Sequence, residues 1–308
     1  MINDAEKEEQ NQLILFDRME VINLTNAQYN LFKNAYISFS GGKDSTLLHY
    51  LIDIALPGNK IPRVFIDTGI EYNYIRDFVF EMAKIDDRFI ILKSNQPIKN
   101  VLNFYGYPFK SKEHSAFLAT YQRSGLTKSV KKYLSSDKKI NCPINLRYQF
   151  TPSFKIKCSS KCCYMLKKNP VHKWEKEFQK TIAITGMRKE EGGQRASIKG
   201  CLITENGKLK KFHPLLVVTE EWEEWFIKYY EIKLCNLYYP PFNFKRTGCK
   251  GCPYSLDLQA QLDIMEQYLP VEKKQCEFIW QPIYAEYRRI GYRLKNYEQL
   301  NLFKGKRE

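Results

Sequence analysis

The feature that most constrains this fold is a short glycine-containing segment, Ser40-Gly-Gly-Lys-Asp-Ser45, between a β-rich run and a helical pattern. The run before it, residues 35–39, predicts a strand, and the residues after it keep helical spacing to about position 55. Glycines let the backbone approach an anion closely, and the unpaired N–H groups at a helix start point toward that anion. Lys43 adds a positive charge. The segment therefore predicts a phosphate-binding loop, and it is not a Walker A loop because Asp44 follows the lysine.

The same alternation of strands and helices continues along the chain. Further strands are expected at residues 63–67, 88–92 and 181–185, and helices at residues 11–34, 72–84, from Thr219 onward and at 259–294. Strands that alternate with helices form βαβ units, so the expected fold class is α/β, with an open, mostly parallel sheet flanked by helices. The first ten residues are charged, and we expect them to be frayed.

The expected domain organisation has three parts. Residues 1–34 form an N-terminal helical segment, and residues 35–258 form a nucleotide-binding domain that includes a basic insertion at about 101–157. Residues 259–308 form a helical C-terminal extension. The second strand of the central domain ends at Asp67-Thr68-Gly69, and the carboxyl ends of neighbouring parallel strands line the ligand crevice of such sheets.

Charge is concentrated in one part of the chain. The whole sequence has 49 Lys and Arg against 34 Asp and Glu, and residues 101–176 alone contain 16 of the basic residues against three acidic ones. Such a block attracts a polyanion, and interleaved aromatic rings can stack on unpaired bases. The block therefore predicts nucleic-acid binding, with the alternative that the lysines are only solvated and the aromatic residues pack in the core. The aromatic residues concerned are Tyr105, Tyr107, Phe109, Tyr121, Tyr133, Tyr148 and Phe154.

Four of the nine cysteines stand in close pairs, Cys162-Cys163 and Cys249-Lys-Gly-Cys252. An odd number of cysteines in a chain of this size does not predict a disulfide framework. Four thiolates can hold Zn²⁺ or an iron–sulfur cluster. Adjacent cysteines do not easily form a zinc knuckle, because neighbouring side chains diverge.

No run of 18 apolar residues occurs, and the first ten residues are polar. We therefore expect no membrane span and no secretory signal, and a cytoplasmic location.

Several motifs in a fixed order carry a family resemblance. After the Ser40–Ser45 loop come the double cysteine with Lys167, Thr185-Gly-Met-Arg188 with Arg195, a Phe-His-Pro-Leu segment at 212–215, and the Cys249–Cys252 pair. Together they resemble the sulfonucleotide (phosphoadenosine phosphosulfate and adenylyl-sulfate) reductase family of the PP-loop adenine nucleotide α-hydrolase-like superfamily, in its [4Fe-4S]-bearing branch. A related functional analogue is the ATP-pyrophosphatase component of DNA phosphorothioation.

The resemblance implies roles for individual residues. It implies that Cys162, Cys163, Cys249 and Cys252 ligate a [4Fe-4S] cluster, with Cys158 as a substitute ligand. It implies catalytic roles for Lys43, Asp44 and Arg188, and places Asp44 on Mg²⁺ or at the helix start. It also implies that ATP or adenylyl sulfate is bound by Ser40, Gly41, Gly42, Lys43, Asp44, Ser45, Asp67, Thr68, Gly69, Lys167, Arg188 and Arg195.

One departure from the family separates the possible activities. Its reductases attack sulfur with a cysteine in a Glu-Cys-Gly-Leu-His context near the C-terminus, and here no cysteine follows Cys276. This favours an ATP pyrophosphatase that acts in sulfur transfer to nucleic acid, with a cysteine desulfurase or another sulfur or electron donor as partner. Two alternatives stay open: a sulfonucleotide reductase that releases sulfite through Cys276 or a borrowed thiol, and a non-catalytic subunit that senses nucleotide or cluster.

Overall fold

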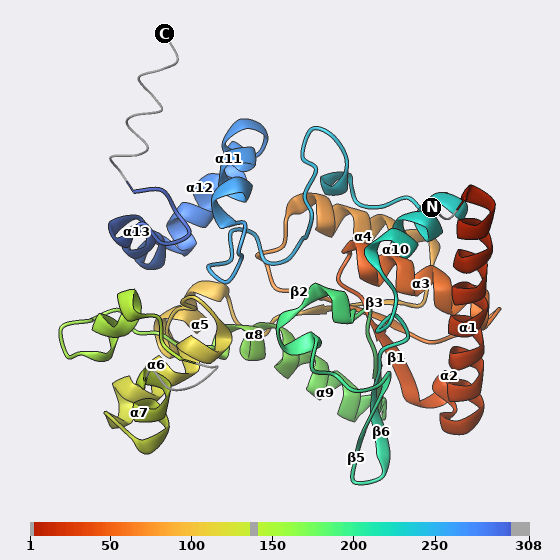
Figure 1. Cartoon of the computed structure of the whole chain (residues 1–308), viewed down its shortest axis with the longest axis horizontal. Coiled ribbons are helices and arrows are strands. Elements are labelled where there is room, and N and C mark those ends of the chain that lie inside the picture. Colours follow the sequence, from red (N-terminus) through yellow and green to blue (C-terminus); the bar gives the residue numbers. More distant parts are fainter. Residues whose placement is uncertain (1–2, 136–140, 297–308) are drawn as a thin grey trace. The chain divides into compact units, whose positions relative to one another are not determined.

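The computed structural model describes residues 3–135 and 141–296 (Figure 1). The chain divides into two compact units that interleave in the sequence. Unit 1 comprises Met1–Asp67, Asn73–Lys93 and Val171–Gly248, and unit 2 comprises Thr68–Tyr72, Ser94–Pro170 and Cys249–Glu308. Among the described helices, none is both long and apolar enough to cross a membrane.

Unit 1 is built on a six-stranded sheet with the strand order β3-β2-β1-β4-β6-β5. All neighbouring strands are parallel except β5 and β6, which form an antiparallel hairpin at one edge. The central strand β1 pairs on both sides, with Ile37 opposite Arg63 of β2 and Ile184 of β4. The predicted α/β fold with an open, mostly parallel sheet is confirmed.

The elements of unit 1 follow the predicted rhythm closely. They are α1 (Asp4–Tyr29), α2 (Leu31–Asn34), β1 (Ala35–Ser38), α3 (Lys43–Ala55), β2 (Arg63–Asp67), α4 (Asn73–Ile85), β3 (Phe89–Lys93), α9 (Asn169–Glu177), β4 (Ile182–Ile184), η3 (Lys189–Glu191), η4 (Gly193–Arg195), β5 (Leu202–Glu205), β6 (Lys208–Phe212), α10 (Glu220–Tyr229) and η5 (Asn236–Tyr238). Helix α9 begins two residues before the boundary of this unit.

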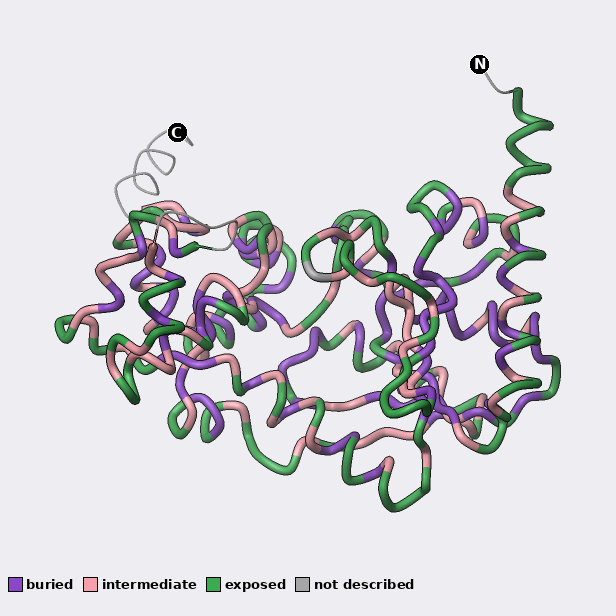
Figure 2. The backbone as a smooth tube through the Cα atoms, turned by 60° about the horizontal axis from the view of Figure 1, so that its bottom comes forward, coloured by how far each residue is buried: buried purple, intermediate pink, exposed green. Residues whose placement is uncertain are grey.

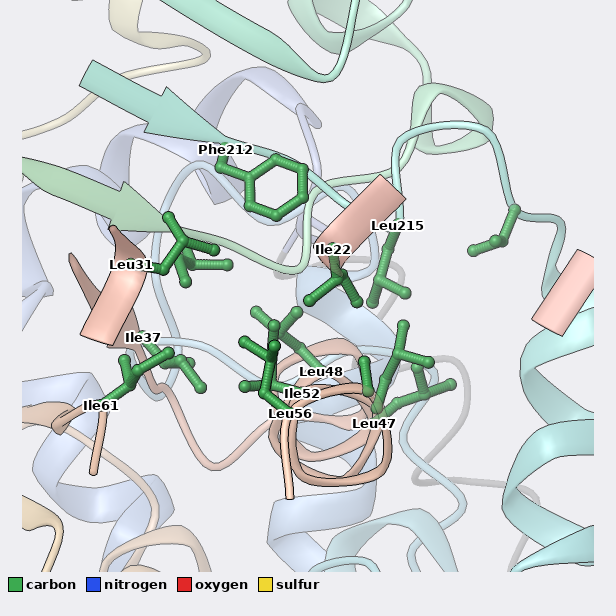
Figure 3. Close-up of a cluster of buried hydrophobic side chains, with 14 of the residues drawn as sticks. Ile22, Leu31, Ile37, Leu47, Leu48, Ile52, Leu56, Ile61, Phe212 and Leu215 are labelled. Atoms are coloured by element: carbon green, nitrogen blue, oxygen red, sulfur yellow. The ribbon is translucent and has the colours of Figure 1, made fainter. Parts of the chain in front are cut away.

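Helices cover both faces of this sheet. Because side chains alternate along a strand, Ile37 of β1 joins the main core with α1, α3 and α10, whereas Tyr36 packs on the opposite face against Trp174 of α9. Figure 3 shows the main core, in which side chains of α3 such as Leu48 meet Ile22 of α1 and Phe212 of β6. This packing fixes the start of α3 at the carboxyl end of β1.

The N-terminus differs from the expectation of fraying. Helix α1 begins at Asp4, where the Asn3 side chain accepts a hydrogen bond from the Glu6 N–H at 2.8 Å. The Glu6 carboxylate accepts one from the Asn3 N–H at 2.9 Å in return, which completes a capping box. The residues of this first part of α1 are exposed (green in Figure 2), so polar contacts support them: the capping box and a hydrogen bond from Nε1 of Trp225 to the Glu8 carboxylate at 2.7 Å.

Unit 2 is helical. Its elements are α5 (Ile98–Tyr105), α6 (Lys112–Ser124), α7 (Lys128–Leu134), η1 (Ile144–Phe150), α8 (Lys161–Cys163), η2 (Tyr164–Lys168), α11 (Leu258–Tyr268), α12 (Pro270–Ile279) and α13 (Gln281–Ile290). Pro270 and Pro282 lie in the first turns of α12 and α13, where proline is tolerated, and they divide the predicted helical tail into separate helices.

Candidate functional site

The predicted phosphate-binding loop lies between β1 and α3 in unit 1. Gly41 has a φ of +71°, and a Cβ there would lie 2.9 Å from Cγ2 of Val79 and 3.0 Å from Cγ2 of Ile75. A side chain at this position would therefore be strained and would clash with α4. The loop is closed internally by the hydroxyls of Ser40 and Ser45, which are 3.0 Å apart.

Helix α3 has no side-chain cap from its own N-cap residue, Gly42. The Lys43 N–H instead donates to the Tyr238 hydroxyl at 2.9 Å, and that hydroxyl lies 2.8 Å from Oγ1 of Thr247. First-turn N–H groups have no partner within a helix. The hydroxyl of Tyr238 thus takes the position at which an anion would meet the helix start.

Two cations flank this helix start, and both are paired with carboxylates. Nζ of Lys43 lies 3.1 Å from Glu220 and 3.6 Å from Glu223. Arg188 lies 3.2 Å from Asp44, 3.1 Å from Glu223 and 2.8 Å from Glu190. The structure therefore brings the three predicted catalytic residues, Lys43, Asp44 and Arg188, into one network.

Glu223 is the central carboxylate of this network, and the sequence reasoning missed it. It lies in α10, is fully buried at 0% exposure and pairs with both cations. Burial, together with the charge of Asp44, raises the pKa of Glu223 to about 8. The only sequence signal was the acidic first turn of α10, in which Glu223 looks like one of several ordinary solvated glutamates.

The remaining predicted nucleotide ligands lie in different places. Asp67, at the end of β2, pairs with Arg76 at 3.6 Å. Arg195 pairs with Glu191, which also lies 3.2 Å from Arg246. These residues belong to unit 1. Arg195 is joined to the network of Lys43 and Arg188 through Glu191, whose carboxylate also accepts a hydrogen bond from the Arg188 N–H at 3.4 Å.

Thr68, Gly69 and Lys167 belong to unit 2. The Thr68 hydroxyl donates to the Glu71 carboxylate at 2.7 Å, and Gly69 has a φ of +78° in the same turn. Nζ of Lys167 lies 3.9 Å from Glu71. This turn is joined to the second cysteine pair by a backbone bridge between Glu71 and Cys249.

The four predicted cluster cysteines come together in unit 2. Cys162 and Cys163 end the short helix α8 and are followed by the π-helical turn η2, and Cys249 and Cys252 lie in the segment before α11. A hydrogen bond from Cys162 and the charges of Lys112, Lys167 and Lys168 lower the pKa of Cys163. The pKa of Cys162 is raised by the same hydrogen bond and by burial, with contributions from Cys249 and Cys252. Each pair therefore senses the charge of the other.

Lys167 is hydrogen-bonded to one of these thiols. It donates a hydrogen bond to Cys249, and the negative charge of that thiolate raises the pKa of Lys167. Burial raises the pKa values of Cys249 and Cys252. Thiols whose ionised forms are stabilised by neighbouring lysines are suited to soft metal chemistry.

Across residues 3–135 and 141–296, no group of three or more His, Cys, Asp or Glu side chains is arranged so that it could hold a single metal ion. The iron–sulfur cluster therefore stays a prediction. A [4Fe-4S] cluster takes one thiolate per iron, and its ligand sulfurs lie farther apart than those around a single metal ion. Four neighbouring cysteine thiols therefore match the type and the number of ligands that this cluster needs. The pKa of Cys158 is raised by burial and by Glu286, and none of the four cysteines contributes to this shift, so the structure gives no sign that Cys158 joins them.

The basic block lies mainly in unit 2, and part of its interpretation is corrected. Phe109 and Tyr133 are buried, at 0% and 2% exposure, because they pack with His114 and other rings inside this unit. They are not available to stack on bases. Lys138 and Lys139 lie outside the described residues. The exposed basic residues are Lys112, Arg123, Lys128, Lys131, Lys132, Lys155, Lys157, Lys161, Lys168, Lys173 and Lys176.

Two exposed aromatic residues of this block are not among those that the sequence pattern predicted to stack on bases. Phe104 is 70% exposed and Tyr164 is 45% exposed. Nζ of Lys157 lies 5.9 Å from the ring centroid of Phe104, and Nζ of Lys161 lies 5.7 Å from that of Tyr164. Each exposed ring is thus paired with a lysine.

The chain matches a family model described as "Phosphoadenosine phosphosulfate reductase domain" over residues 131–255. This range includes the four cysteines, Lys167, Arg188 and Arg195, and it does not include the Ser40–Ser45 loop. The match confirms the resemblance that the motifs predicted. No curated protein sequence matches the chain.

Solved structures match this chain at low sequence identity. One is phosphoadenylyl-sulfate reductase from Candida auris, with 16% identity over 81% of this chain and 96% of that chain and a TM-score of 0.46. Another is FMN adenylyltransferase from Candida glabrata in complex with ATP, with 16% identity over 75% of this chain, a TM-score of 0.44 and only 58% of that chain spanned. A third is the U34-tRNA thiolase NcsA from Methanococcus maripaludis with its [4Fe-4S] cluster, with 15% identity over 91% of this chain and 80% of that chain and a TM-score of 0.38.

Proposed function

We propose that this protein is a PP-loop ATP pyrophosphatase that activates an acceptor for sulfur transfer, and that the acceptor is a nucleic acid. In this reaction an acceptor oxygen bonds to the α-phosphorus of ATP. The bond from that phosphorus to the bridging oxygen breaks, and pyrophosphate leaves with the electron pair. The residues around the start of α3 are suited to hold the departing pyrophosphate.

The nucleotide site rests on three features of unit 1. The first-turn N–H groups of α3 supply donors, and Lys43 and Arg188 supply two cations beside them. A bound phosphate would displace the Tyr238 hydroxyl from the Lys43 N–H and would compete with Glu220 and Glu223 for the cations. Arg188 is 5% exposed, so a phosphate held by its guanidinium would be largely desolvated.

The state of Cys276 favours this activity over a sulfonucleotide reductase. The side chain is 0% exposed, and burial raises the pKa of its thiol to about 12. A buried, protonated thiol is a poor nucleophile. The reductase reading then needs a thiol borrowed from another molecule, whereas cleavage of ATP needs none.

The four cysteines would hold a [4Fe-4S] cluster, which would supply the capacity to carry sulfur or electrons. Lys167 would balance part of the negative charge of the thiolates, since it already donates to Cys249. A cysteine desulfurase, or another donor of sulfur or electrons, is the partner that such a site requires.

The nucleic-acid acceptor rests on the exposed lysines of residues 101–176 and on the pairs Phe104–Lys157 and Tyr164–Lys161. Exposed rings stack on unpaired bases, and lysines neutralise the backbone. Reversing Lys128, Lys131 and Lys132 to Glu should weaken binding to single strands, duplex DNA and tRNA while ATP binding is unchanged. A matched control reverses Lys199, Lys208 and Lys233, which are equally exposed in unit 1. Equal losses in both triple variants would contradict a specific surface, and no binding by the parent at low salt would remove the acceptor.

The activity itself is tested with anaerobically purified protein. Incubation with ATP should release pyrophosphate, and incubation with adenylyl sulfate should release no sulfite. Lys43→Ala and Arg188→Ala should each abolish most of the release. Sulfite release without pyrophosphate release would favour the reductase.

A further inference from the structure

The C-terminal helices hold the segment that carries the second cysteine pair. Nε1 of Trp280 donates to the Lys250 carbonyl at 3.1 Å, and the Tyr284 hydroxyl donates to the Gly251 carbonyl. The Tyr287 hydroxyl donates to the Pro253 carbonyl at 2.9 Å. Nη1 of Arg293 also donates to the Pro253 carbonyl, at 2.6 Å. Four side chains thus hold three carbonyls within four residues of chain.

Three of these donors come from one face of one helix. Trp280 is the N-cap residue of α13, and Tyr284 and Tyr287 follow four and seven positions later, which is the spacing of a single helical stripe. Their exposures are 1%, 0% and 0%, so each hydrogen bond is shielded from water. Buried tyrosine and tryptophan need partners for their polar atoms, and here the partners are the cysteine segment.

The cysteine segment also packs directly on these helices. Gly251 has a φ of +60°, and a Cβ there would lie 2.8 Å from both Cβ and Sγ of Cys276 and would clash with the Tyr284 hydroxyl. A glycine at this position therefore lets the backbone lie against α12 and α13. It also explains the burial of Cys276 as packing beneath the segment.

Further hydrogen bonds anchor the segment as well. The Lys250 N–H donates to the Ile70 carbonyl at 2.7 Å, and Nζ of Lys250 donates to Gln275 at 2.6 Å. The N–H of Tyr254 forms a hydrogen bond with the sulfur of Cys252. With its carbonyls turned to α13, the segment presents an N–H group to a cysteine sulfur, and such bonds tune iron–sulfur clusters.

We propose that Trp280, Tyr284 and Tyr287 are positioning residues that hold the 249–253 segment in the conformation in which Cys249 and Cys252 bind the cluster. The C-terminal helices are then part of the cysteine site and not an accessory extension. This inference rests on the proposed function, because the segment is held in place in order to bind the cluster. The hydrogen bonds themselves make it testable without the cluster.

The test compares Tyr284→Phe, Tyr287→Phe and the double variant with the parent. Phenylalanine keeps the ring and its packing and removes only the donor. Tyr292→Phe is the matched control, because its ring packs against Tyr287 with centroids 5.3 Å apart and its hydroxyl makes none of the bonds to the segment. Two readouts are used: alkylation rates of Cys249 and Cys252 in the chelator-treated full chain, resolved by peptide mass spectrometry, and iron retained by anaerobically purified protein during a chelator challenge.

Loss of the Tyr284 hydrogen bond should raise alkylation at Cys249 and Cys252 roughly fivefold. Loss of the Tyr287 hydrogen bond should raise it less, because Arg293 still donates to the Pro253 carbonyl. Cys201 in unit 1 should react at an unchanged rate. Iron loss should accelerate in the same order of variants. Unchanged alkylation in the double variant, or the same increase in Tyr292→Phe, overturns the proposal. A parent that binds no iron refutes the cluster, and alkylation alone then decides whether these residues hold the segment.

Discussion

Glu223 gives the sharpest prediction, because it places a titrating carboxylate between the two cations that would bind phosphate. Its pKa is raised to about 8 by burial and by Asp44. The groups that face it are Lys43, Asp44 and Arg188. Glu223 is therefore mostly neutral near pH 7 and mostly ionised above pH 9 or so, and ATP affinity should fall as the pH rises through this window.

The size of the effect follows from the distances. Glu223 lies 3.1 Å from Arg188 and 3.6 Å from Lys43, so a phosphate held by both cations would lie about 6 Å from the carboxylate. At an effective dielectric constant of about 20, the repulsion is roughly 3 kcal/mol for each unit of charge. We therefore expect a loss of affinity of about tenfold between about pH 7.5 and 9.5, since part of the penalty is relieved by proton uptake.

The assay is calorimetric titration of a non-hydrolysable ATP analogue at several pH values. Glu223→Gln should bind at the parent's low-pH affinity throughout. Glu220→Gln is the control: hydrogen bonding to Lys43 lowers the pKa of Glu220, so that carboxylate stays ionised throughout and its removal should leave the pH dependence intact. If Glu223→Gln keeps the slope of the parent, Glu223 does not control the site.

Three further predictions concern the phosphate-binding loop, a buried histidine and the cysteine site. Lys43→Ala should weaken ATP binding by about 1–3 kcal/mol. Gly42→Val should weaken it more, because a Cβ at that position would lie 3.2 Å from the hydroxyls of both Thr247 and Tyr238. Parent-like ATP binding by both variants would refute the phosphate-binding loop. Burial lowers the pKa of His114 to about 4, so its contribution to stability is complete above about pH 6.5 and is lost as the pH falls toward 4. The free energy of unfolding in urea, measured at pH 4 and at pH 6.5, should differ between the two pH values by roughly 3 kcal/mol less in His114→Gln than in the parent. Cys252→Ala should lose iron and solubility while Cys201→Ala keeps both, and equal iron contents would contradict the ligand assignment.

Much of the sheet could be predicted because its signals are local. The four predicted strands match β1, β2, β3 and β4, and the loop and helix that follow β1 lie where the pattern predicted them. The hairpin of β5 and β6 was missed although Asn206-Gly207 marks its turn, with φ values of +51° and +72°. Its strands are rich in lysine and exposed residues, so a pattern based on buried β-branched residues does not find them.

The capping box of α1 was equally visible, as an Asn followed three residues later by Glu, but the charged composition suggested fraying. Glu223 was not predictable in the same way. Its importance depends on the packing of α10 beside α3, which no local pattern records. The role of Trp280, Tyr284 and Tyr287 likewise depends on contacts with a segment about 30 residues earlier in the chain.

The central claim is that the start of α3 holds the pyrophosphate part of ATP while the bond at the α-phosphorus breaks. The most direct measurement is the identity of the products from ATP labelled at the α-phosphorus, separated after incubation with anaerobically purified protein and a single-stranded nucleic acid. We predict labelled AMP, free or joined to the acceptor, with one pyrophosphate for each, and little of it with Lys43→Ala. Labelled ADP with inorganic phosphate, or unchanged ATP alongside sulfite release from adenylyl sulfate, would contradict the account.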